Sequence, residues 1–232
     1  MSTATAILNA EEIRVSDLVS ELLAEFPPKS TDPVTFLGAQ FDKGLAWVHF
    51  EEGFGGLGLN PKLQRLVNER IYAEGAPNPV ARNPIGHGMC GPTVAVWGSP
   101  EQKKRYLRPL FTGEEVWCQL YSEPEAGSDA TSQKTTAIDK GDHYILNGTK
   151  NWITNGGSAD YYLVIAQTDK EKGHRGINAF IVEKTWDGFE IGPKEDKLGI
   201  RGSDTHTLNF NDVKVPKENR IGEDGFGFKF AM

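Results

Sequence analysis

The chain has 232 residues, of which 38% are hydrophobic, 25% charged and 10% aromatic, a composition typical of globular proteins. This length suffices for one large domain or two ordinary ones. The formal net charge of −7, with no basic run longer than residues 103–105, argues against nucleic acid as a partner.

Residues 1–115 carry helical signals and are predicted to form an all-α domain. Ile13, Leu18 and Leu22 share one face of a helix that ends at the prolines after Phe26. Asn60 followed by a proline is a typical helix start. We expect helices over residues 13–26, 31–41, 60–75, 89–98 and 99–113, the last three ending at glycines.

Residues 53–58 (GFGGLG) match the glycine pattern of dinucleotide-binding sites and follow a strand-like run at residues 46–50. That fingerprint also needs a helix opening at the third glycine and an acid about 20 residues further on. Here Pro61 delays the helix, and Asn78 and Pro79 stand where the acid belongs. We therefore interpret the motif as a tight surface loop between helices.

After Trp117 short runs rich in β-branched and aromatic residues alternate with turn residues. Residues 139–142 and the Asn147-Gly148 pair have the chemistry of hairpin turns. Strands without helices between them predict a barrel or sandwich, not βαβ units. The expected strands are residues 131–138, 143–146, 161–168, 178–182, 189–191 and 205–210.

Residues 226–232 (FGFKFAM) have the composition of a new helix, but the sequence stops after about one and a half turns, too short for a stable isolated helix. We therefore expect a chain truncated at the start of a third domain.

The two cysteines, Cys90 and Cys118, form no spacing motif, which indicates packing roles in a reducing compartment. The N-terminus lacks a continuous apolar run and carries early acids, against a secretory or mitochondrial leader. No apolar segment approaches the ~20 residues that span a bilayer. We expect a cytoplasmic protein that does not enter the membrane. No histidine has a second ligand at metal-binding spacing, so no metal site is predicted.

Residues 117–154 are the most informative stretch. Around Gly127, consecutive N–H groups and the Ser128 hydroxyl suit an anion nest. Trp152 offers a stacking face and Thr154 a hydroxyl, although Trp152 could equally be a buried core residue. Together they predict a site for a flat aromatic ring and a nearby phosphate.

The order and spacing of these motifs resemble the acyl-CoA dehydrogenase family over nearly the whole chain. The resemblance implies an α+β fold with an all-α N-terminal domain (residues 1–115) and an antiparallel β-barrel domain that binds flavin (residues 116–220). Residues 221–232 would begin the C-terminal four-helix bundle, before which the chain is truncated. The matching segments are residues 52–59, 98–110, 113–114, 117–129, 147–155, 198–212 and 215–232.

The resemblance also implies which residues bind FAD. Trp152 is the stacking wall, the Thr154 hydroxyl lies near the reactive N5, and Ser128 also contacts the substrate. Two departures from the family pattern are Ser122, where threonine is frequent, and Glu125, where glycine is usual. The full set implied to bind FAD is Gln119, Leu120, Tyr121, Ser122, Gly127, Ser128, Trp152, Ile153 and Thr154.

The implied reaction is α,β-desaturation of an acyl-CoA thioester, with loss of the α-proton and hydride transfer to flavin N5. Glu123 and Asp129 lie in flavin-contacting turns and are interpreted as structural. The resemblance places the catalytic base in the missing C-terminal domain. We therefore expect residues 1–232 alone to be inactive.

Partners implied by the resemblance are acyl-CoA, an electron-transfer flavoprotein, and either a homotetramer or a chain that supplies the C-terminal bundle. Residues 117–122 look closer to bacterial members that act on unusual acyl groups than to central enzymes of fatty acid metabolism. Two alternatives stay open. One is a flavin monooxygenase or oxidase of the same fold, and the other is a module that binds flavin or acyl-CoA without chemistry.

Overall fold

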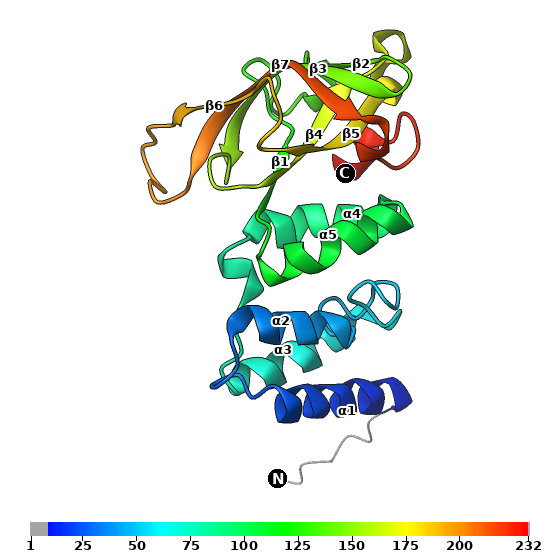
Figure 1. Ribbon diagram of the computed structural model, residues 1–232, viewed down its shortest axis with the longest axis vertical. Coiled ribbons are helices and arrows are strands. Elements are labelled where there is room, and N and C mark those ends of the chain that lie inside the picture. Colours follow the sequence, from blue (N-terminus) through cyan, green and yellow to red (C-terminus); the bar gives the residue numbers. More distant parts are fainter. Residues whose placement is uncertain (1–8, 232) are drawn as a thin grey trace.

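A computed structural model describes residues 9–231, with side chains to residue 230. Its helical layers lie beneath a mostly antiparallel sheet (Figure 1). Within the described residues the α-helices are α1 (Ala10–Glu25), α2 (Pro33–Asp42), α3 (Gln64–Ala73), α4 (Gly91–Trp97) and α5 (Pro100–Thr112). A 3-10 turn (Pro61–Leu63) precedes α3 and a π-helical turn (Gly86–Cys90) precedes α4.

Capping residues define where the longer helices begin and end. In α1 the Asn9 side chain accepts from the Glu12 N–H, and the Glu12 carboxylate accepts from the Asn9 N–H. Ser99 and Gln102 make the same reciprocal capping box at the start of α5. The helix ends at Gly113, whose φ of 75° is the left-handed conformation that glycine adopts without strain. The expected helices are therefore confirmed, with small shifts at their ends.

The glycine-rich segment at residues 53–58 is a loop between α2 and α3, as expected, and residues 46–50 are not a strand. The 3-10 turn that leads into α3 begins at Pro61, three residues beyond the last glycine. A Cβ on Gly56 would lie 2.1 Å from the carbonyl oxygen of Phe50. Close backbone packing therefore accounts for a glycine there.

The sheet has eight strands in the described residues and runs in the order β6-β7-β3-β2-β4-β5-β8, with β1 added on β4. Only the β1–β4 and β2–β4 pairs are parallel. The strands are β1 (Trp117–Leu120), β2 (Thr136–Asp139), β3 (His143–Thr154), β4 (Tyr161–Gln167), β5 (Ile177–Glu183), β6 (Phe189–Lys194), β7 (Thr205–Pro216) and β8 (Arg220–Ile221).

The expected barrel is an open sheet, because no pairing among the described residues joins β6 to β8. With only two residues, β8 offers too few backbone groups for closure, and the β6–β7 arm extends away from it (Figure 1). The predicted hairpin turn at Asn147-Gly148 was wrong. Both residues lie inside β3, opposite a bulge in β7, and β3 continues to Thr154. The strand expected over residues 131–138 begins only at Thr136, after a 3-10 turn (Ala130–Ser132).

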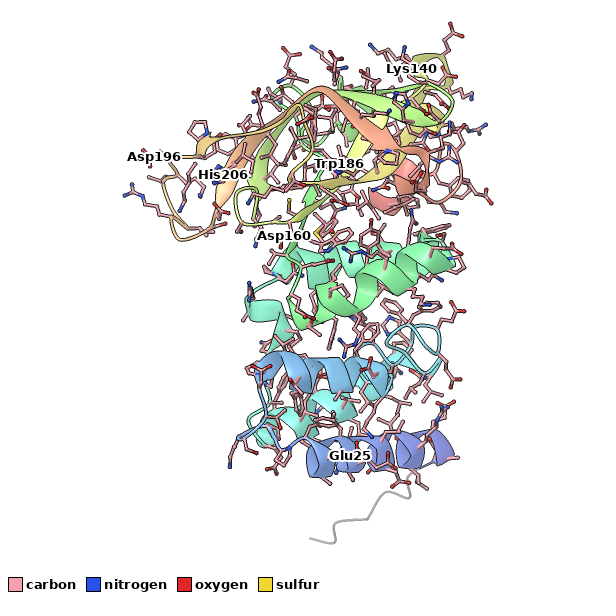
Figure 2. The ribbon with its side chains drawn as sticks, viewed as in Figure 1. Glu25, Lys140, Asp160, Trp186, Asp196 and His206 are labelled. Atoms are coloured by element: carbon pink, nitrogen blue, oxygen red, sulfur yellow. The ribbon has the colours of Figure 1, made fainter. Side chains whose placement is uncertain are left out.

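Strands β4 and β5 join two apolar cores. Tyr161, Leu163 and Ile165 face the helices, whereas the alternate residues of β4 face the interior of the sheet. This burial on both faces explains why β4 reads as a continuous apolar run. At the junction the Arg105 guanidinium donates to the Tyr161 hydroxyl over 2.7 Å. Figure 2 shows Asp160 at the same junction, where its carboxylate accepts from the backbone of the segment that enters β1.

After β8 the chain returns toward α4, where Phe226 and Phe230 pack on Trp97 at centroid distances of 5.8 and 5.4 Å. The helix expected at residues 226–232 is a 3-10 turn (Gly227–Ala231) as far as the structure describes it, and Met232 lies outside the described residues. None of the helices over residues 9–231 is both long and apolar enough to cross a bilayer.

Candidate functional site

The end of β1 leads into a tight turn. Leu120 is fully buried, and beyond it the Glu123 N–H donates to the Ala126 carbonyl over 2.9 Å, with the reciprocal bond at 3.2 Å. This closed turn leaves Gly127 and Ser128 exposed directly after it. A Cβ at Gly127 would meet no protein atom within 4 Å, so the space beside its Cα is open. We call residues 122–128 the phosphate turn, for the role expected of it.

The end of β3 holds the second expected segment, residues 152–154, which we call the ring segment. A bulge between Lys150 and Ile153 interrupts the pairing with β7. It turns Trp152 outward, with 58% of its surface exposed and a left-handed φ of 61°. Ile153 is buried in the sheet core, whereas Thr154 is half-buried. The exposure of the indole contradicts the alternative that Trp152 is a buried core residue. Its strained backbone holds the indole outward, where its face is free for a ligand.

Hydrogen bonds hold the ends of β1 and β3 side by side. The Asn151 N–H donates to the Ser122 carbonyl over 2.9 Å. The Lys150 ammonium donates to the Tyr121 carbonyl over 3.1 Å. The structure thus brings together two segments that lie about 30 residues apart in the sequence, and the expected site residues flank this contact.

Lys150 is the functional candidate that the sequence reasoning missed. Its side chain is completely buried, and its ammonium also lies 2.9 Å from oxygens of Glu123 and Gln133. The signal for it was present, because Tyr144, Leu146 and Lys150 share the inward face of β3 by strand alternation. A lysine at such a position requires buried partners.

The Glu123 carboxylate is equally engaged. One oxygen accepts from Lys150 and from the Thr135 N–H, and the other accepts from the Lys134 N–H over 2.6 Å. Burial raises the pKa of Glu123, but the Lys150 charge and these donors outweigh burial and leave the pKa below its usual range. Burial lowers the pKa of Lys150, and Glu123 opposes that shift. Glu123 is therefore structural and ill-suited to take a proton from a substrate.

Several polar groups around the two segments have no protein partner. Among the hydrogen bonds of residues 9–231, none involves the side-chain hydroxyls of Ser122, Ser128 or Thr154. The Gln119 side-chain oxygen and the Tyr121 hydroxyl are buried and likewise unpaired. Burial raises the pKa of Tyr121 to about 12, so its hydroxyl keeps its proton and can donate. Free hydroxyls beside an exposed indole fit a flat ring that bears hydrogen-bonding edges.

A second cluster supports the loop after the ring segment. The Asp204 carboxylate accepts from the N–H groups of Gly157 and Ser158 over 3.1 and 2.7 Å. It also lies 2.6 Å from the His206 Nε2, and Figure 2 shows His206 near the start of β7, beside the loop that joins β6 to β7. Burial raises the pKa of Asp204, but its hydrogen bonds outweigh burial and lower it. Over the stretch that the structure describes, no group of His, Cys, Asp and Glu is arranged to hold a metal ion.

A hollow of about 310 Å³ lies beside the phosphate turn. Glu125, the departure noted in the sequence, lines it and pairs with Lys134 across an exposed surface. Its extra negative charge is therefore compensated locally. The hollow is lined by Glu123, Pro124, Glu125, Lys134, Thr135, Gly148 and Thr149.

Comparison with known proteins identifies two matching family profiles. The N-terminal domain of acyl-CoA dehydrogenase matches residues 14–114, and the middle domain matches residues 118–213. The short-chain specific acyl-CoA dehydrogenase of Clostridium acetobutylicum is 37% identical over 234 residues, which cover 94% of this chain and 61% of the relative. The chain thus spans less than two thirds of that relative's length.

Two solved structures extend the comparison. Butyryl-CoA dehydrogenase from Megasphaera elsdenii has a TM-score of 0.68 at 36% identity, and the match covers all of this chain and 62% of that one. A chain in a structure of the electron transferring flavoprotein of Acidaminococcus fermentans has a TM-score of 0.66 at 36% identity, covering 97% of this chain and 61% of that one.

Proposed function

The chain belongs to the acyl-CoA dehydrogenase family, and from that premise we propose that it forms the FAD-binding part of a short-chain acyl-CoA dehydrogenase. The observation that carries the proposal is the contact between the phosphate turn and the ring segment. It gathers free hydroxyls and an exposed indole at one place on the sheet. The phosphate turn adds two exposed residues, Gly127 and Ser128, and the N–H groups of such a turn suit a pyrophosphate.

Each expected residue then has a role. The Trp152 face would pack against the flavin ring, and the Thr154 hydroxyl would donate a hydrogen bond to the ring. Ser122 binds the ring, whereas Gly127 and Ser128 hold the pyrophosphate, and Ser128 also reaches the substrate. Gln119, Leu120, Tyr121 and Ile153 shape the wall beneath.

The bound flavin would supply the hydride acceptor for α,β-desaturation of the thioester. Neither Glu123 nor Asp129 is free to remove the α-proton. Glu123 is engaged by Lys150 and two N–H groups, and Asp129 accepts from the hydroxyls of Thr131 and Ser132. We therefore propose that neither acid is the base, which the family resemblance places in the C-terminal domain.

The relatives suggest a short acyl chain, in contrast to the unusual acyl groups expected from residues 117–122. The natural acceptor of the electrons is an electron-transfer flavoprotein, in line with the Acidaminococcus fermentans match. We further propose a homo-oligomer, for which the tetramer is the starting hypothesis.

The test is to purify the full-length protein and identify the released cofactor by chromatography. FAD is expected. A nicotinamide, or no cofactor after reconstitution with FAD, would overturn the proposal. The reduced protein should then react slowly with oxygen and rapidly with an electron-transfer flavoprotein. Fast reaction with oxygen would favour the oxidase alternative instead.

A further inference from the structure

The buried Lys150–Glu123 pair lies directly behind the proposed site. The side chains of Lys150 and Glu123 are 0% and 5% exposed, so neither can contact a ligand bound at the protein surface. We infer that Lys150 is a positioning residue, which holds the ring segment at a fixed place relative to the phosphate turn. This inference rests on the proposed function, because it concerns how well those two segments receive one ligand.

The geometry of the ammonium carries the inference. Lys150 has three donor hydrogens and three acceptors within hydrogen-bond distance, namely the Tyr121 carbonyl, a Glu123 oxygen and the Gln133 side-chain oxygen. All three acceptors belong to the segment between β1 and β2, whereas Lys150 stands on β3, two residues before Trp152. One side chain therefore connects the two halves of the site.

The segment between β1 and β2 depends on the same cluster for its own shape. Glu123 accepts from the N–H groups of Lys134 and Thr135, which bends the end of this segment back toward its beginning. The bonds of Lys150 then attach the bent segment to β3. The hydrogen bond from the Asn151 N–H to the Ser122 carbonyl is a further link between the two segments, and Asn151 directly follows Lys150 in the sequence.

Stability alone is a weak reason for such a pair. Taking two charges out of water is costly, and apolar residues of similar volume often stabilise a fold as well or better. A buried charged network instead fixes one geometry, since every donor and acceptor must be satisfied together. A site that must fit a rigid ring and a pyrophosphate at once requires that kind of fixed spacing.

Three variants of the full-length protein test the inference. Lys150→Met removes the ammonium and keeps the apolar stem, and Glu123→Gln removes the charge and keeps the shape. The double variant Glu123→Gln/Lys150→Met leaves no unpaired buried charge and so separates folding from positioning. Lys140→Met is the matched control, because Lys140 is exposed in the turn between β2 and β3, at the opposite end of β3 from Lys150.

Three properties are measured for each variant. These are the thermal unfolding of the apoprotein, the FAD affinity by fluorescence and the visible circular dichroism of the bound flavin. Both single variants should unfold at lower temperature. The double variant should regain apoprotein stability yet bind FAD about tenfold or more weakly, which corresponds to about 1.4 kcal/mol. Its flavin spectrum should differ from that of wild type, whereas Lys140→Met should match wild type in every measurement.

A double variant with restored stability and with wild-type FAD affinity and dichroism would overturn the positioning role and leave the proposed function standing. Wild-type protein that binds no FAD would overturn both. Failure of the double variant to fold shifts the decision to Glu123→Gln, whose FAD affinity must fall relative to Lys140→Met for the inference to hold.

Discussion

The backbone N–H of Asn151 donates to the carbonyl of Ser122 over 2.9 Å. This bond joins the end of β3 to the end of β1 and places the ring segment beside the phosphate turn. Because each segment alone is a common turn or strand end, their juxtaposition is what makes a ligand site of them.

Thr154→Val in the full-length protein should slow flavin reduction by substrate more than it weakens substrate binding. A hydrogen bond to the ring matters most while the hydride arrives, and loss of one such donor costs roughly 1–3 kcal/mol. Single-turnover mixing with butyryl-CoA measures both quantities. Thr154→Ser, which keeps the hydroxyl, is the control. An unchanged reduction rate in Thr154→Val would assign Thr154 a packing role only.

Trp152→Asn should weaken FAD binding without destabilising the apoprotein. The residue has a φ of 61° and is 58% exposed, so replacing it removes little buried surface. Asparagine tolerates the left-handed region better than tryptophan, where the strain is roughly 1–2 kcal/mol. Chemical denaturation of the apoprotein tests the predicted stability, and FAD titration tests the predicted loss of affinity. A marked loss of apoprotein stability would show that the indole serves packing instead.

Trp152→Phe is the companion variant, because it keeps an aromatic face at the same backbone position. It should retain more FAD affinity than Trp152→Asn. Equal affinities in the two variants would argue against stacking on the ring.

His87 should make stability depend on pH. It lies among aromatic rings in the helical part, with centroids 5.0 Å from Trp47 and 4.9 Å from Phe111, and burial lowers its pKa to about 4. The unfolded chain binds the proton near pH 6.5, before the native protein does. The stabilisation is therefore complete above pH 6.5 and is lost as the pH falls toward 4, by about 3 kcal/mol.

The measurement for His87 is the free energy of unfolding between pH 7 and 4, compared with the same curve for His87→Phe. Carboxylates that titrate in both proteins cancel in the difference. The difference between wild type and variant should shift by about 3 kcal/mol over this range. Parallel curves would mean that His87 is accessible to protons in the folded state.

Gly148→Ala should destabilise the fold by about 1–3 kcal/mol. Gly148 has a φ of 145°, and a Cβ there would lie 2.5 Å from the Thr135 hydroxyl oxygen. Gly127→Ala is the matched control for stability, since its Cβ would meet no atom within 4 Å. Equal unfolding free energies of the two variants would contradict the close packing of Gly148 against Thr135.

Helix caps, strand alternation and the spacing of turn residues were enough to predict the five helices and most strands, because these signals are local. The hairpin prediction at Asn147-Gly148 failed because the same pair also occurs beside a register shift within a sheet. Only the pairing of β3 with β7 decides between the two structures. Closure of the sheet depends on the lengths of β6 and β8 and on the path between them, which no local pattern determines.

For the candidate site too, local motifs could be predicted from the sequence, whereas contacts between distant segments could not. The residues of the phosphate turn and ring segment could be named from motifs and from a family resemblance. Lys150 was not predicted because its side chain is buried and belongs to no ligand-binding motif. Its partners Tyr121, Glu123 and Gln133 are 17 to 29 residues away, so the network forms only once β3 pairs in the sheet.

The central claim is that this chain builds the flavin site of an acyl-CoA dehydrogenase, and anaerobic titration of the FAD-loaded full-length protein with butyryl-CoA tests it most directly. The account predicts that the yellow flavin absorbance bleaches as one enoyl-CoA forms per flavin reduced. It also predicts that Thr154→Val slows the bleaching. A protein that holds FAD but neither bleaches nor forms enoyl-CoA with butyryl-CoA or longer acyl-CoA thioesters would contradict it.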